Sequence, residues 1–146
     1  MKRVLAAENR KARFDIAVEE EIEAGMMLTG DEIKSIREGR VQLTGSYVKV
    51  MNRGGKQLPK VVIIGSHLSA AKDPDRSRVL LMRSSEIRHL QEMLSERGKT
   101  AVPLKIIMKH GWAKVIVGIG IGRKTHDKRQ LLKDRDLDRD ARRSLL

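Results

Sequence analysis

Residues 102–119 read VPLKIIMKHGWAKVIVGI, two apolar runs on either side of His110-Gly111. Every second residue is apolar in both runs: Val102, Leu104, Ile106 and Met108, then Ala113, Val115, Val117 and Ile119. A period of two predicts half-buried strands, and the glycine between the runs permits a turn. We therefore expect two consecutive strands joined by a turn.

Working toward the N-terminus, more segments have strand character than helix character. Residues 14–22 alternate, with Phe14 at their start, and residues 47–51 and 57–64 flank the turn sequence Asn52-Arg53-Gly54-Gly55-Lys56. Residues 79–82 form a short apolar run, whereas residues 66–78 are polar and are expected to be mobile. Residues 1–12 resemble a basic arm.

Two short helices interrupt these strands. Thr29 and Glu32 have the spacing of a capping box, and Gly39 marks the end of the helix that follows. Ser84 or Ser85 is expected to cap a second helix that stops at Gly98.

Strand thus follows strand without regular helical crossovers, so a parallel α/β sheet is disfavoured. The sequence predicts a mainly β protein with accessory helices, built as a small closed antiparallel barrel, because closure removes exposed strand edges.

The composition favours a polyanionic partner. The chain has 146 residues, enough for one domain, and a net charge of +12 with a pI of about 10.4. Nucleic acid is favoured over a membrane surface because no long amphipathic basic helix is evident. Aromatic residues make up only 2% of the chain, so we expect contacts with RNA backbone and shape more than base stacking. The chain lacks a signal peptide and a membrane-spanning run, which predicts a soluble cytoplasmic protein.

Residues 122–146 form a polar, largely basic tail. Neutralising phosphates with such a segment releases counterions, which favours binding to nucleic acid. Acid–base pairs such as Asp136 with Arg139 and Asp140 with Arg143 have helical spacing, but these weak pairs alone leave a helix marginal in water. A frayed tail and a helix that orders on a charged surface are equally consistent with the sequence.

No catalytic, metal or cofactor site is predicted. The glycine-rich stretch 118–125 lacks the spacing of a phosphate-binding loop and is interpreted as a strand end that a neighbouring backbone approaches closely. The acidic cluster Glu19, Glu20, Glu21 and Glu23 is interpreted as a solvated face with basic neighbours. The four histidines lack close metal-ligand spacing, and the absence of cysteine removes thiolate chemistry.

Short blocks along nearly the whole chain together resemble one family. They are Asn9-Arg10-Lys11-Ala12-Arg13, Glu23-Ala24-Gly25, Leu28-Thr29-Gly30, Glu32-Ile33-Lys34-Ser35-Ile36-Arg37, Gly39-Arg40-Val41, Ser46-Tyr47-Val48, Asp73-Pro74-Asp75-Arg76, Val102-Pro103-Leu104, Ala113-Lys114-Val115 and Asp127-Lys128-Arg129. In this order they resemble the small protein B (SmpB) family, which binds transfer-messenger RNA (tmRNA).

The resemblance implies an OB-fold barrel at residues 13–121 between the arm and a flexible tail that becomes helical on the ribosome. It implies an RNA-binding adaptor for trans-translation that delivers tmRNA to stalled ribosomes, a monomer when free, with elongation factor Tu as a further possible partner. A generic OB-fold RNA binder is the alternative, and an enzyme has no supporting constellation.

Site residues follow from the same resemblance. The positions matched to tmRNA binding are Asn9, Glu23, Leu81 and Lys114. The positions matched to the part of the tail that acts in the decoding centre of the small ribosomal subunit are Arg123, Lys124, His126, Asp127, Lys128 and Arg129. The cations would contact ribosomal RNA phosphates, and His126 would stack on or hydrogen-bond to a base.

Overall fold

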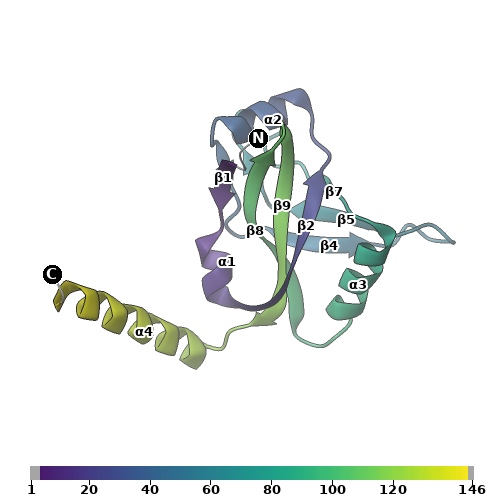
Figure 1. Ribbon diagram of the computed structural model, residues 1–146. Coiled ribbons are helices and arrows are strands. Elements are labelled where there is room, and N and C mark those ends of the chain that lie inside the picture. Colours follow the sequence, from purple (N-terminus) through teal and green to yellow (C-terminus); the bar gives the residue numbers. More distant parts are fainter. Residues whose placement is uncertain (1–3, 145–146) are drawn as a thin grey trace.

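The computed structural model describes residues 4–144, which form a mainly β body with accessory helices (Figure 1). The strands are β1 (Val4–Glu8), β2 (Ile16–Met26), β3 (Val41–Gln42), β4 (Tyr47–Met51), β5 (Lys60–Ile64), β6 (His67–Leu68), β7 (Arg78–Leu81), β8 (Lys99–Lys109) and β9 (Trp112–Gly122). The helices are α1 (Arg10–Asp15), α2 (Gly30–Arg37), α3 (Ser84–Leu94) and α4 (Thr125–Ser144). No helix within residues 4–144 is long and apolar enough to cross a bilayer.

The predicted pair of strands in residues 102–119 is confirmed as the β8–β9 hairpin. Its turn places His110 and Gly111 at positive φ, 53° and 78°, the conformation for which glycine is suited. The expected strict alternation is broken, because a bulge between Pro103 and Lys105 inserts one extra residue. Leu104 therefore packs in a separate small cluster with α1, while Ile106 faces the main core.

Within residues 4–144, neighbouring strands of the large sheet pair antiparallel. Its order is β1-β8-β4-β5-β7-β2-β9, and β9 pairs with β8 as well as with β2. Strands β3 and β6 form a separate two-stranded sheet. The main core lies against the large sheet and includes Ile36 of α2 and Leu90 of α3, which are almost fully buried.

The glycine-rich stretch at the end of β9 allows close packing, as the sequence predicts. A Cβ atom on Gly120 would lie 2.0 Å from the carbonyl oxygen of Ala17 on β2, so the strands could not stay at their present separation. A Cβ atom on Gly118 would lie 2.6 Å from Leu104 Cδ1, the side chain that the bulge in β8 redirects. These glycines serve packing within the body.

The first residues of the described chain differ from the expected arm. Val4–Glu8 pair with β8, in a register that sets Glu8 opposite Lys105, so this segment belongs to the sheet. The strand expected from Phe14 begins only at Ile16, because residues 10–15 form α1. Alternation alone misplaced Phe14, since a six-residue helix shows too little of its own period to be recognised.

Residues 66–78, expected to be mobile, are anchored to the body by a buried side chain, although several of them are exposed. Arg78 is fully buried, and its Nε donates to Glu32 Oε2 at 2.5 Å. Its other nitrogens donate to the backbone oxygens of Ser66, Asp73 and Pro74, at 3.0–3.1 Å. A single buried guanidinium therefore holds the polar loop against α2, and composition alone gave no sign of it.

Helix starts were predicted with mixed success. The capping box of α2 is confirmed, with the Thr29 N–H donating to Glu32 Oε1 at 2.9 Å and Gly39 at φ 72° after the helix. Arg83, and neither Ser84 nor Ser85, is the N-cap of α3, because the Arg83 N–H reaches Glu86 Oε1 at 3.0 Å. Strand β5 begins at Lys60, so the connection from β4 is longer than the predicted turn.

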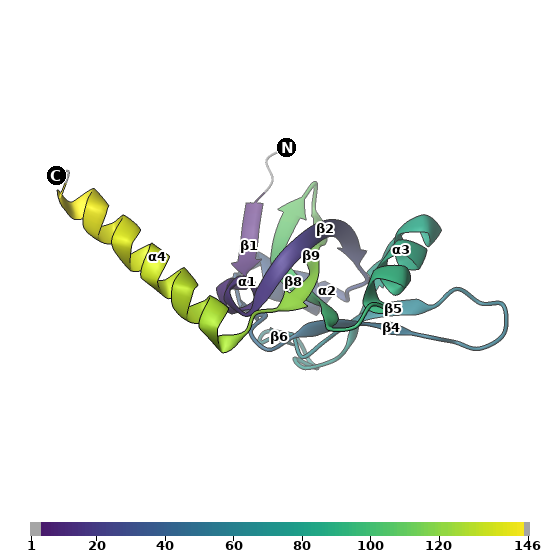
Figure 2. The same ribbon diagram turned by 90° about the horizontal axis from the view of Figure 1, so that it is seen from below.

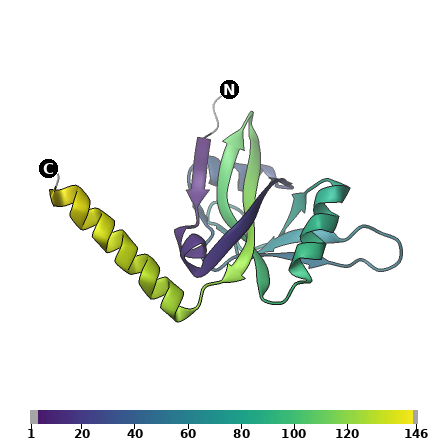
Figure 3. The ribbon, with the colours of Figure 1, turned by 60° about the horizontal axis from the view of Figure 1, so that its bottom comes forward.

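Two elements project from the body on opposite sides. Seen from below, α4 extends to one side and the β4–β5 hairpin to the other (Figure 2). The intermediate view shows α1 lying beside the start of α4 (Figure 3). Residues 125–144 of the tail are therefore a helix in this structure, rooted beside α1, and residues 145–146 lie outside the described residues.

Candidate nucleic-acid interface

An open groove lies on the large sheet, where the last residues of β2 run between β7 and β9. Its volume is about 580 Å³, and its lining residues are Glu23, Gly25, Leu81, Met82, Arg83, Glu86 and Lys114. We call this the Gly25 groove. Three of the four residues matched to RNA binding, Glu23, Leu81 and Lys114, meet here although they are far apart in the sequence.

Strand register explains why these side chains converge. Gly25 pairs with Leu81 on one side and with Lys114 on the other, so the two side chains flank a residue that has none. A Cβ atom on Gly25 would lie 3.4 Å from Leu81 Cβ and 3.6 Å from Lys114 Nζ. The glycine thus leaves bare backbone as the floor of the groove.

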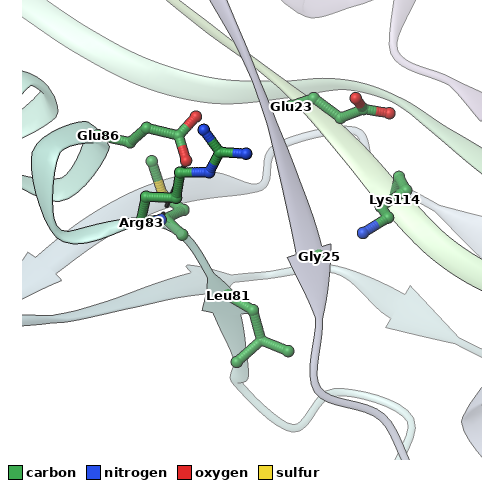
Figure 4. Close-up of a pocket in the computed structure, with 7 residues that line it drawn as sticks. Glu23, Gly25, Leu81, Arg83, Glu86 and Lys114 are labelled. Atoms are coloured by element: carbon green, nitrogen blue, oxygen red, sulfur yellow. Dashed lines mark hydrogen bonds between the residues drawn. The ribbon is translucent and has the colours of Figure 1, made fainter.

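The groove has charges at its rim and an apolar patch beside its floor. Lys114 points toward Gly25 from the β9 side, and Arg83 and Glu86 lie on the α3 side (Figure 4). Leu81 is 51% exposed, which is high for a leucine at the end of a strand. Ammonium and guanidinium groups beside an accessible apolar surface can bind phosphates and the faces of bases or sugars.

Asn9 lies away from this groove and is 2% exposed. Its Nδ2 donates to the carbonyl oxygens of Leu43 at 3.1 Å and Pro103 at 2.9 Å, and its Oδ1 accepts from the Ala12 N–H at 3.2 Å. The side chain thereby caps α1 and ties it to β8. Its hydrogen-bonding groups are occupied within the protein, so direct contact with RNA does not fit this arrangement.

The acidic cluster on β2 has the basic neighbours that the sequence predicts. Glu19 binds Lys99 at 2.8 Å, and Glu21 binds Arg13 at 3.1 Å. Glu20, which interrupts the alternation, lies with its Oε1 atom 2.8 Å from His89 Nε2 of α3. Each of these three carboxylates thus has a partner that lowers the repulsion in the cluster.

A second groove, of about 480 Å³, lies between α4 and the ends of β2 and β9. Arg123, His126 and Asp127 line it, together with Gln130, Leu131 and Asp134. His126 Nδ1 lies 3.1 Å from Asp127 Oδ1, and its side chain is 86% exposed. The structure thus brings together only part of the tail set. Lys124 and Arg129 are exposed but do not line the groove.

Lys128 faces the body and holds the root of α4. Its Nζ lies 3.0 Å from Asp15 Oδ1 and 5.8 Å from the centre of the Phe14 ring, with Arg135 at 5.9 Å from the same ring. The Arg123 N–H donates to the Asp15 carbonyl oxygen at 2.7 Å. Hydrogen bonds from Lys11 and Lys128 lower the pKa of Asp15, which keeps it ionised.

Arg83, Glu86 and Met82 were missed by sequence reasoning. Met82 and Arg83 follow Leu81 directly, and Glu86 lies in the first turn of α3, so nearness in the sequence was the one available signal. Their position beside Lys114 depends on β2 lying between β7 and β9, which no local pattern encodes.

Comparison with known proteins places this geometry in context. The model of the family described as SmpB protein matches residues 6–146. An SsrA-binding protein of Lactobacillus acidophilus is 45% identical over 146 residues, covering 95% of this chain and 93% of that protein. Relatives with the same name in Leuconostoc mesenteroides and Streptococcus pyogenes are 46% and 41% identical, covering 94% and 97% of this chain and 90% and 92% of those proteins.

Comparison with solved structures points to the same family as the sequence comparison. A chain from work described as "tmRNA-SmpB: a journey to the center of the bacterial ribosome" superposes with a TM-score of 0.66 at 33% identity. The match covers 86% of this chain and 93% of that one.

Proposed function

The chain belongs to the SmpB protein family, and we propose that the Gly25 groove is the surface with which it holds tmRNA. The protein is an RNA-binding adaptor of trans-translation and not an enzyme, with tmRNA and the ribosome as its partners. Because the protein acts on ribosomes, we expect it in the cytoplasm.

The observation that carries the proposal is the convergence of Glu23, Leu81 and Lys114 around a residue without a side chain. Lys114 supplies a cation for an RNA phosphate, and Arg83 supplies another across the floor. Leu81 offers an apolar surface to a base or sugar. Glu23 accepts a hydrogen bond from a base edge or orients a nearby cation, which adds selectivity that phosphate contacts lack.

The body is proposed to be a closed antiparallel barrel of the OB type. Its support is the series of pairings β8-β4-β5-β7-β2-β9 together with the β9–β8 hairpin. Closure would keep the curvature of β2 fixed, and with it the spacing of Leu81 and Lys114 across Gly25.

Asn9 acts indirectly in this proposal. By capping α1 it positions Phe14 and Asp15, which contact the root of α4. Its replacement is therefore expected to disturb the tail more than the Gly25 groove.

The tail is proposed to probe the decoding centre and the mRNA channel as a helix. Lys124 and Arg129 are exposed and available to ribosomal RNA phosphates, and His126 is exposed enough to stack on a base. Arg123, Asp127 and Lys128 would rearrange from their present contacts near the body. Association with elongation factor Tu and a monomeric free state stay predictions.

A salt titration with two RNAs tests the groove. Wild-type protein is expected to bind tmRNA more tightly than ordinary tRNA, and Lys114→Ala should weaken tmRNA binding and lower the log–log salt slope by about 1. Lys109→Ala, a strand lysine outside the groove, is the matched control. Equal affinity for both RNAs with a steep slope would reduce the interaction to non-specific phosphate attraction.

Truncation after Gly122 tests the tail separately. The shortened protein should keep its tmRNA affinity but lose tagging of peptides on stalled ribosomes. Tagging that survives this truncation would contradict the proposed role of α4 and leave a generic RNA binder.

A further inference from the structure

The carboxylates of this chain are unevenly distributed. Residues 39–72 are thirty-four consecutive positions without an aspartate or glutamate, although the chain contains nineteen of them. An even distribution would place about four in this segment. The same segment carries the cations Arg40, Lys49, Arg53, Lys56, Lys60 and Lys72.

The central part of this segment is the projecting β4–β5 hairpin (Figure 2). Arg53, Lys56 and Lys60 are exposed there and form no ion pair within residues 4–144. Lys99, by contrast, is held by two carboxylates at 2.7 and 2.8 Å. The hairpin cations are therefore available to an external anion.

A second hollow, distinct from the groove beside α4, joins the hairpin to the Gly25 groove. Arg53, Pro59 and Lys60 line that hollow, which has a volume of about 230 Å³. Leu81 and Met82 line both hollows, so their surfaces are continuous. No acidic residue lines the second hollow among the described residues, and Met27 and Val79 add apolar surface.

A bound nucleic acid is the occupant that this surface fits. Cations above an apolar floor match the phosphates and the bases or sugars of one RNA strand. Since the neighbouring hollow is the proposed RNA site, the same RNA has only to pass Leu81 and Met82 to reach the hairpin.

We propose that tmRNA held in the Gly25 groove continues across Leu81 and Met82 onto the β4–β5 hairpin, where Arg53 and Lys60 contact its phosphates. The inference rests on the proposed function of the Gly25 groove. It extends that site by a second cluster of phosphate contacts. The Gln91 Nε2 donates to Asn52 Oδ1 at 3.3 Å, which links α3 to the first residue of the loop between β4 and β5.

The test compares two double variants in tmRNA binding at several salt concentrations. Arg53→Gln with Lys60→Gln should lower tmRNA affinity by about tenfold or more and the log–log salt slope by about 2, one for each phosphate contact. Lys34→Gln with Arg37→Gln removes the same charge from exposed positions of α2 that line neither hollow, and should change affinity by no more than about twofold. Urea unfolding midpoints of both variants verify that the fold is kept.

The Lys114→Ala variant separates this inference from the proposed function. If Lys114→Ala weakens binding but the hairpin variant equals its control, the extension is wrong and the Gly25 groove stands. If neither variant weakens binding, both proposals fail together. A hairpin variant with unchanged tmRNA affinity but reduced binding to isolated small ribosomal subunits would assign the hairpin to ribosomal RNA and overturn the extension.

Discussion

The Glu32–Arg78 contact and helix α4 both depend on charged side chains, but they differ in how much water surrounds those charges. Glu32 and Arg78 are 2% and 0% exposed, and every nitrogen of Arg78 has an acceptor. In α4, the Asp136–Arg139 pair has side chains 63% and 62% exposed. The buried pair fixes a loop to the body, whereas the exposed pairs leave α4 available to a partner.

The largest effect is expected from Glu32→Gln. Removing the charge leaves Arg78 buried with only neutral acceptors. It also weakens the contact between residue 32 and Arg76. The free energy of unfolding should therefore fall by about 3–5 kcal/mol. Urea unfolding at pH 7 measures it. A loss below 1 kcal/mol would mean that the buried pair is no stronger than the exposed pairs of α4.

Acidification should reproduce that loss in the wild-type protein. Burial alone would raise the pKa of Glu32, but hydrogen bonds from Arg76, the Thr29 N–H and Arg78 outweigh it and lower the pKa from 4.5 to about 2. The stabilisation is therefore present above pH 4.5 and is lost as the pH falls toward 2. The difference in unfolding free energy between wild type and Glu32→Gln should therefore narrow as the pH falls over this range. The neighbouring Asp31 also has a lowered pKa, about 2, so Asp31→Asn is the control that separates its titration from that of Glu32.

Gly120→Ala tests a contact that involves no charge, the close packing of β2 against β9. The added methyl group would meet the Ala17 carbonyl oxygen, so β2 and β9 must move apart, at a cost of about 1–3 kcal/mol. Gly122→Ala has nothing within 4 Å of the new Cβ atom and should change stability far less. Equal unfolding midpoints for the two variants would contradict the close strand approach.

Asp15→Asn should loosen α4 without unfolding the body. It removes the charge that binds Lys128, a partly exposed contact expected to contribute less than about 1 kcal/mol to stability. Because the chain has no cysteine, labels at Thr44→Cys and Lys133→Cys can report the position of α4 by pulsed electron spin resonance. The distance distribution should broaden in Asp15→Asn and stay narrow in Asp136→Asn.

The smallest effect is expected from Asp136→Ala. An exposed pair three residues apart on a helix contributes about 0.2–0.5 kcal/mol, so α4 should lose slight helicity by circular dichroism while the body keeps its unfolding midpoint. A shift of the body's midpoint would show that α4 contributes to the stability of the sheet.

The sequence was sufficient where a feature is local. The β8–β9 hairpin and the capping box at Thr29 both depend on residues near one another in the chain. The glycine-rich stretch predicted a close backbone approach at Gly120, but the sequence did not reveal that the neighbour is Ala17 of β2. The bulge at Leu104 was not predictable, because the apolar pattern looks regular and the extra residue shows only in the register with β9.

The candidate site was predicted in part. Glu23, Leu81 and Lys114 were selected by resemblance, and the pairing of β2 with β7 and β9 unites them. Arg83 was missed because its place at the groove depends on that pairing and on its role as N-cap of α3. The role of Asn9 in tmRNA binding stays a prediction, and nothing in its local sequence reveals that it is buried against Leu43 and Pro103.

Strand β2 has a further consequence, because it sets a fixed length between two sites. Gly25 lies near one end of the β2–β9 ribbon, and Ile16, paired with Gly122, lies at the other, where the chain turns into α4. On β9 the same span runs from Lys114 to Gly122, and eight residues at about 3.3 Å each separate these points by roughly 26 Å. The paired strands β2 and β9 therefore set a fixed distance between the Gly25 groove and the start of the tail. Inserting one residue into β2 or β9 would both increase this distance and turn every later side chain of that strand to the opposite face.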